Sequence, residues 1–135
     1  MQGFILLNKP SGITSFSAVA KIKRIAGEKR VGHTGTLDPM ATGLLVVFVG
    51  RATRAVEFAE QHDKRYLAGL RLGQTTDTQD ITGNTLASSD KLPSEEELKA
   101  ALENFKGEIS QIPPMYSAIK VNGQRLYEIA RRGGE

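Results

Sequence analysis

Six consecutive apolar residues at positions 44–49 (LLVVFV) constrain the fold more than any other part of the chain, and a glycine bounds them on each side. The run is short and rich in branched side chains, which favours a strand over a helix. Because neither face of such a strand is polar, we expect it in the centre of a sheet. A second apolar run at residues 3–7 ends at Lys9-Pro10 and predicts a buried strand that leaves the sheet there.

The sequence predicts one helix between these two runs and another after residues 44–49. Thr14 or Ser15 can cap a helix that ends at Gly27. Apolar residues recur within it at near-helical spacing, and the expected buried stripe consists of Phe16, Val19, Ile22 and Ile25. A short helix is expected over residues 53–61.

The second half of the chain carries signals of both kinds. Alternation from Lys64 predicts a strand with Tyr66 near its start; one face would hold Tyr66, Ala68, Leu70 and Leu72. Residues 94–97 (SEEE) form a capping box whose acids suit the positive end of a helix dipole. The helix is expected to end at Gly107 and to bury Leu98, Ala101, Leu102 and Phe105.

A hairpin and a helix are expected near the end of the chain. Asn122-Gly123 between residues 117–121 and Gln124 predicts a type I′ turn, and residues 126–132 predict a short helix. Strands and helices are mixed without βαβ regularity. The predicted class is therefore α+β, with a mixed, mostly antiparallel sheet flanked by helices.

Composition excludes several classes of protein. With 135 residues, the chain is one domain or part of one. It has no cysteine, which excludes a disulfide framework and a thiolate metal site and is compatible with a cytoplasmic location. No apolar run approaches membrane-spanning length, so no membrane contact is expected.

Residues 33–43 (HTGTLDPMATG) place one carboxylate, Asp38, in a loop whose other residues mostly fix backbone shape. Gly35 and Gly43 permit dihedrals that other residues resist, and Pro39 disfavours the helical region at Asp38. Asp-Pro alone is typical of a turn. The eleven residues together favour a catalytic carboxylate presented by the loop.

Positive charge precedes this loop. The net charge of +3 and pI of about 9.3 favour a polyanionic partner only weakly. Glu28 is the only acid among five basic residues within ten positions, namely Lys21, Lys23, Arg24, Lys29 and Arg30. Phosphate contacts there would bring a nucleic acid to the carboxylate. The alternative is the solvated face of an amphipathic helix.

The loop sequence GTLDP, followed by ATGLL and preceded by a histidine, resembles the catalytic loop of pseudouridine synthases, and within them that of the tRNA pseudouridine synthase B family. Further segments resemble blocks of the same family in order: NKPSGITS (residues 8–15), KRY (64–66), LGQTTDTQD (72–80), PPMYSA (113–118) and YEIAR (127–131). The resemblance covers essentially the whole chain.

The resemblance implies an enzyme that isomerises uridine-55 in the T-loop of tRNA to pseudouridine, with tRNA as its partner. The reaction breaks an N-glycosidic bond, rotates the uracil and rejoins it through carbon, so no cofactor and no metal are expected. Asp38 corresponds to the catalytic aspartate, which acts as nucleophile or as base on a flipped nucleotide and must be ionised.

Other positions take roles from the same resemblance. Tyr66 would stack on the flipped uracil, and its alternative is a core aromatic at the start of a strand. His33 would contact and help open the T-loop, and its alternative is a loop histidine bonded to backbone. Asp80 would lie near the RNA. The cluster of positive charge before the loop, independently of the resemblance, makes Lys21, Lys29 and Arg30 candidate RNA-binding residues. Support of the catalytic loop is assigned to Lys9, Pro10, Gly35 and Pro39.

The resemblance also predicts the domain organisation. Residues 1–135 correspond to the amino-terminal portion of the catalytic domain. The family's later catalytic strands, a basic residue that pairs with the aspartate and a carboxy-terminal RNA-binding domain have no counterpart in these residues. The full-length enzyme is expected to be monomeric. The alternatives are a non-catalytic tRNA-binding or folding module and an inactive half-domain.

Overall fold

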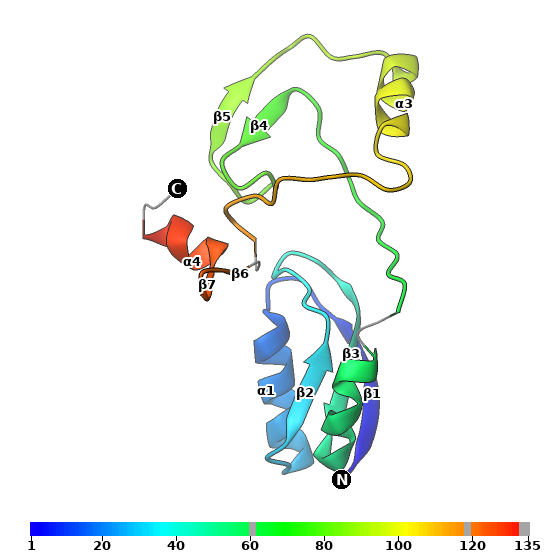
Figure 1. Cartoon of the computed structure of the whole chain (residues 1–135), viewed down its shortest axis with the longest axis vertical. Helices are drawn as coiled ribbons and strands as arrows, with labels where there is room; N and C mark the ends of the chain where they lie inside the picture. Colours follow the sequence, from blue (N-terminus) through cyan, green and yellow to red (C-terminus); the bar gives the residue numbers. More distant parts are fainter. Residues whose placement is uncertain (60–61, 118–119, 133–135) are drawn as a thin grey trace. The chain divides into compact units, whose positions relative to one another are not determined.

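The computed structural model describes residues 1–59, 62–117 and 120–132, which form two compact units, Met1–Tyr66 and Leu67–Glu135 (Figure 1). Both units contain helices and antiparallel strands, so the predicted α+β class is confirmed. Among the described residues, no helix is long and apolar enough to cross a membrane.

The first unit is built on a three-stranded antiparallel sheet. Its strands are β1 (Gly3–Lys9), β2 (Val31–Thr34) and β3 (Gly43–Val49), in the order β1-β3-β2. Figure 1 shows β3 between its two neighbours, as the apolar run predicts. The central position explains that run, because β3 is paired along both edges and has buried side chains on both faces, Val47 on one and Phe48 on the other.

Different elements lie against the two faces of this sheet, and the second face is only partly covered. Ile5 and Leu7 of β1 lie opposite Val47 and Leu45 of β3, and this face packs against α1 (Ser15–Ala26). The buried residues of this core are Ala18, Val19, Leu45 and Val47. On the other face Gly32 lies close to Thr53 and Val56, which belong to the 3₁₀ helix η1 (Gly50–Ala55) and to α2 (Val56–Ala59).

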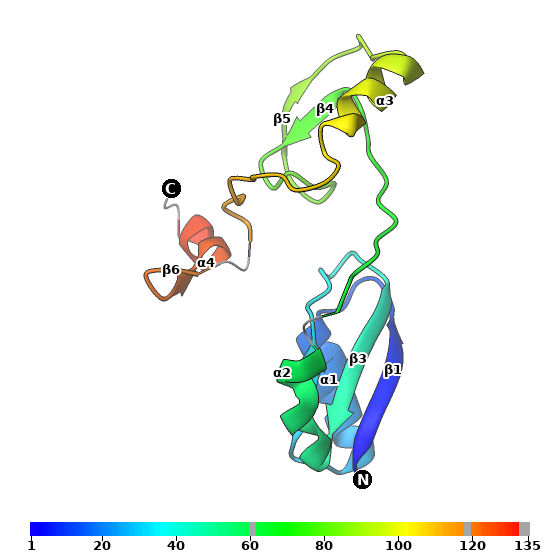
Figure 2. The same cartoon turned by 45° about the vertical axis from the view of Figure 1, so that its right-hand side comes forward.

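The prediction that the first strand is buried was wrong for one of its faces. Phe4 and Leu6 are 65% and 63% exposed. Figure 2 shows β1 beside β3, and in the sheet order β1 is an edge strand. Phe4 contacts Phe48 in a tilted arrangement with ring centroids 6.3 Å apart, but this contact leaves most of its ring in solvent.

Helix α1 begins and ends where the sequence predicts. Thr14 is the N-cap, and its side chain accepts a hydrogen bond from the Ser17 amide at 3.0 Å. Gly27 adopts the left-handed conformation with φ of 60° and ends the helix. The predicted stripe was wrong at its two ends, since Phe16 and Ile25 are about 80% exposed. A strict three-residue spacing drifts around a helix of 3.6 residues per turn, so only its middle members face the sheet.

The helix expected over residues 53–61 is divided into two elements. It consists of η1, in which the Thr53 hydroxyl donates to the Gly50 carbonyl at 2.9 Å, followed by the single turn of α2. Residues 60 and 61 lie outside the described residues.

The second unit contains β4 (Gln74–Thr76) paired antiparallel with β5 (Thr85–Ser88). The strand expected from Lys64 onward was wrong, because residues 62–72 form no strand. Leu67 is fully exposed and Leu70 is 68% exposed. Alternation of apolar residues favours an extended backbone, but a strand also needs a hydrogen-bonded neighbour, and none of the described residues pairs with this segment.

Helix α3 (Glu95–Glu103) confirms the predicted capping box. The Ser94 hydroxyl accepts from the Glu97 amide at 3.2 Å, and the Ser94 amide donates to the Glu97 carboxylate at 2.8 Å. The helix ends at Glu103, before the predicted Gly107. Its expected buried stripe was also wrong, since Leu102 and Phe105 are 48% and 69% exposed. An amphipathic stripe is buried only where another element covers it.

The predicted hairpin is confirmed by β6 (Lys120–Val121) and β7 (Gln124–Arg125). Asn122 and Gly123 have φ values of 51° and 82°, the two positive angles that a type I′ turn requires. Helix α4 (Leu126–Arg131) follows, as expected. Residues 118 and 119 of the predicted first strand lie outside the described residues.

Candidate active site

The loop that carries Asp38 connects β2 to β3 and forms a turn at its centre. The Asp38 carbonyl accepts a hydrogen bond from the Ala41 amide at 3.0 Å, with Pro39 at the second position, where its locked φ suits a turn. Asp38 is exposed, and none of the described residues forms a hydrogen bond or ion pair with its carboxylate. The Asp-Pro turn and the exposed carboxylate therefore occur together.

The backbone after Asp38 is held by Lys9. Its side chain is fully buried, and its ammonium group donates to the carbonyl oxygens of Pro10 at 2.9 Å, Ile13 at 2.8 Å and Pro39 at 3.3 Å. The Gly12 amide also donates to the Pro39 carbonyl, at 2.8 Å. The end of β1 is thereby joined to the turn that follows the aspartate.

The backbone before Asp38 is held by Ser15. The Ser15 hydroxyl donates to the Leu37 carbonyl at 3.1 Å and accepts from the Leu37 amide at 3.0 Å. Ser15 is 2% exposed. Sequence reasoning considered this residue only as a helix cap and missed the contact. The block NKPSGITS (residues 8–15) held the available signal, because it offers two adjacent hydroxyl residues for one cap. Thr14 caps the helix, which leaves Ser15 for another partner.

His33 lies in β2, where it is paired opposite Val47. Its Nδ1 atom is 2.7 Å from the Gly35 carbonyl oxygen. The structure therefore shows a histidine bonded to the backbone, which was the alternative interpretation of His33. Gly35 has φ of 68° and lies near the side chain of Lys64. The bond from His33 constrains the first turn of the loop, and a contact with RNA stays a prediction.

Tyr66 lies in the non-strand segment that follows Lys64 and is 67% exposed. The alternative of a core aromatic at the start of a strand is therefore wrong. An exposed aromatic face is the arrangement that base stacking requires.

Asp80 belongs to the second unit, in the loop between β4 and β5. The hydroxyl of Thr82 donates to its Oδ1 atom at 2.6 Å, as do the Thr82 amide and the Thr78 hydroxyl at 2.8 Å each. These bonds, that of the Thr82 hydroxyl above all, lower the pKa of Asp80. Asp80 thus organises its own loop.

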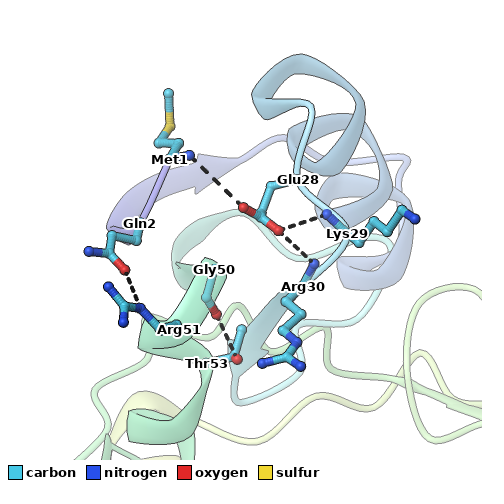
Figure 3. Close-up of polar contacts among 8 residues, drawn as sticks. All are labelled: Met1, Gln2, Glu28, Lys29, Arg30, Gly50, Arg51 and Thr53. Atoms are coloured by element: carbon cyan, nitrogen blue, oxygen red, sulfur yellow. Dashed lines mark hydrogen bonds and ion pairs between the residues drawn. The ribbon is translucent and has the colours of Figure 1, made fainter.

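The predicted cationic residues Lys21, Lys29 and Arg30 are exposed. Glu28 holds the backbone of the last two, accepting from the Lys29 amide at 2.9 Å and the Arg30 amide at 3.4 Å (Figure 3). Figure 3 shows the Lys29 side chain turned away from the guanidinium groups of Arg30 and Arg51. Lys29 and Arg30 precede β2 and the Asp38 loop follows it, so about 13 Å of strand, at roughly 3.3 Å per residue, separates them.

Comparison with known proteins identifies the class. Residues 23–135 match the model of the TruB family pseudouridylate synthase (N terminal domain). The chain belongs to this family, which confirms the resemblance found in the sequence. Proteins named tRNA pseudouridine synthase B are 48% identical to it over 135 residues in Fusobacterium nucleatum and 52% identical over 136 residues in Clostridium tetani. Each alignment covers 100% of this chain and 47% of the relative. The chain therefore spans about half the length of these relatives.

Solved structures agree with the fold. A chain in the crystal structure of a Cbf5–Nop10–Gar1 complex is 31% identical, with a TM-score of 0.59 over 87% of this chain and 31% of that one. A chain in the archaeal box H/ACA sRNP Nop10–Cbf5 complex is 32% identical, with a TM-score of 0.53 over 79% of this chain and 29% of that one. The fold is thus that of part of a pseudouridine synthase catalytic domain.

Proposed function

We propose that the protein containing this chain converts uridine to pseudouridine in tRNA, and that residues 1–135 form the amino-terminal portion of its catalytic domain. The observation that carries this proposal is the exposed Asp38 on a loop whose preceding and following residues are both held by buried side chains. The relatives that align with the whole chain at 48% and 52% identity are named tRNA pseudouridine synthase B, and these names support the same activity.

The reaction requires a carboxylate beside a nucleoside. The bond between C1′ of the ribose and N1 of uracil breaks, the base turns, and C5 bonds to C1′. The proton that leaves C5 is balanced by the proton that N1 gains, so substrate and product are isomers. Asp38 supplies the carboxylate, either as nucleophile or as base.

The substrate is the uridine of the T-loop, flipped out of its stack to reach Asp38. Tyr66 presents an exposed ring on which a flipped uracil can stack, and such stacking is typically worth about 1–3 kcal/mol per base. His33 contacts the opened loop of the RNA. The exposed Lys21, Lys29 and Arg30 bind phosphates of the adjoining stem, which positions the RNA without reading its sequence.

A T-arm stem-loop RNA tests the proposal. It is incubated with the 135-residue chain and with a protein of the relatives' length that contains this sequence, and pseudouridine is measured. We expect Asp38→Asn to abolish product in every form that is active, with RNA binding retained. Asp90→Asn is the matched control, since it makes the same change at another exposed aspartate. Full activity of Asp38→Asn would contradict the proposal, as would RNA binding by the longer protein with no product.

A further inference from the structure

We propose that Ser15 is a positioning residue for Asp38, and this inference rests on the proposed function. One hydroxyl bonds both the amide and the carbonyl of Leu37, the residue immediately before the aspartate. A serine hydroxyl has one donor and two acceptor positions. A single serine side chain can therefore hold both the amide and the carbonyl group of one residue.

The burial of Ser15 indicates what its hydroxyl is for. Ser15 and Lys9 are the two buried polar side chains among the residues whose burial the structure describes. Buried polar groups in proteins are almost always hydrogen-bonded. Ser15 makes both of its bonds to Leu37 of the Asp38 loop, and Lys9 makes one of its three bonds to Pro39 of that loop. The start of α1 does not need Ser15 for its cap, because the Thr14 side chain already accepts from the Ser17 amide.

Together the two side chains hold the backbone on either side of the aspartate. Leu37 is held on one side by Ser15, and Pro39 is held on the other by Lys9 and Gly12. Asp38 lies between two fixed backbone positions while its carboxylate is exposed. Catalytic groups must be held to about 0.5 Å of their productive geometry, and a misplacement of about 1 Å can reduce a rate roughly 100-fold. Ser15 supplies half of this constraint from another segment of the chain.

The test compares Ser15→Ala with Thr14→Ala in the form of the protein that makes product in the T-arm assay. Both variants lose a hydroxyl near the start of α1, but only Ser15→Ala loses the bonds to Leu37. We expect Ser15→Ala to lower kcat by about 10–100-fold with KM within about twofold. We expect Thr14→Ala to lower the melting temperature and leave kcat within about twofold. Ser15→Thr keeps the hydroxyl and should recover most of the lost kcat.

Amide hydrogen exchange gives a second readout that does not depend on activity. The Leu37 amide should exchange faster in Ser15→Ala and at its original rate in Thr14→Ala. Unchanged Leu37 exchange or unchanged kcat in Ser15→Ala would overturn the proposal, as would unfolding of that variant, which would make the hydroxyl a folding determinant. Activity retained by Asp38→Asn would instead refute the proposed function, and the exchange result would still decide whether Ser15 holds Leu37.

Discussion

The ammonium nitrogen of Lys9 lies 3.3 Å from the carbonyl oxygen of Pro39, a residue thirty positions later in the chain. An ammonium group has three donors, and the other two reach the carbonyl oxygens of Pro10 and Ile13. From the end of β1, Lys9 therefore joins two backbone positions that follow this strand to a third in the Asp38 loop. This explains why a lysine is fully buried next to a loop that presents a carboxylate.

Lys9→Met should destabilise the protein because it removes a buried ammonium group that donates to the carbonyl oxygens of Pro10 and Ile13. Hydrogen bonds to a charged group contribute about 1.5–3 kcal/mol, so the free energy of unfolding should fall by about that amount. Urea denaturation measures it. Lys23→Met makes the same change at an exposed position of α1 and should stay within about 0.5 kcal/mol of the parent. Equal effects of the two substitutions would show that the Lys9 contacts contribute little.

Leu45→Ala and Leu44→Ala test which face of β3 forms the core. Leu45 is 1% exposed and Leu44 is 64% exposed. Removing a buried leucine side chain costs about 2–5 kcal/mol, whereas Leu44→Ala should change stability by no more than about 0.5 kcal/mol. Thermal and urea unfolding of both variants provide the comparison. A larger effect at Leu44 would mean that the strand faces are assigned the wrong way round.

Gly50→Ala should destabilise the protein more than Gly27→Ala. Both glycines have a φ near 65°, where an L side chain costs about 1–2 kcal/mol. A Cβ atom at Gly27 would meet open space, but at Gly50 it would lie 2.7 Å from the Met1 carbonyl oxygen and 3.1 Å from Gln2 Cβ. The difference between the two variants in unfolding free energy measures the clash. No difference would mean that the Met1–Gln2 segment moves aside without cost.

Thr82→Ala should raise the pKa of Asp80 toward its ordinary value, because the Thr82 hydroxyl is the main cause of its lowered pKa. A lowered folded-state pKa contributes stability that is present above the unfolded pKa and is lost as the pH falls through the folded value. The second unit should therefore be less sensitive to acid in the variant. Carboxyl ¹³C titration by NMR tests this, with Thr75→Ala as a control that leaves the Asp80 bonds intact. An unchanged pKa in Thr82→Ala would refute the assigned cause.

Local signals in the sequence predicted local structure correctly. The capping box at Ser94, the left-handed Gly27 and the Asn122-Gly123 turn depend on dihedrals and hydrogen bonds within a few residues. Local sequence therefore favours such features without help from distant residues. The strand at residues 44–49 was predictable because a run that is apolar on both faces fits only the centre of a sheet.

Predictions that required a distant partner were the ones that failed. The expected strand from Lys64 has no pairing strand among the described residues, and the stripe containing Leu102 and Phe105 stays largely in solvent. Periodicity in a sequence shows which face of an element is able to be buried. It does not show what, if anything, lies against that face.

The sequence by itself determined the family, the Asp38 loop and its turn, because the glycines, the proline and the aspartate act through the local backbone. Only the tertiary structure decided how that loop is held. Ser15 and Leu37 are 22 positions apart and Lys9 and Pro39 are 30 apart, so neither pair follows from any local pattern. They meet because α1 packs against the sheet and β1 pairs with β3, which brings two buried polar groups to either side of one exposed carboxylate.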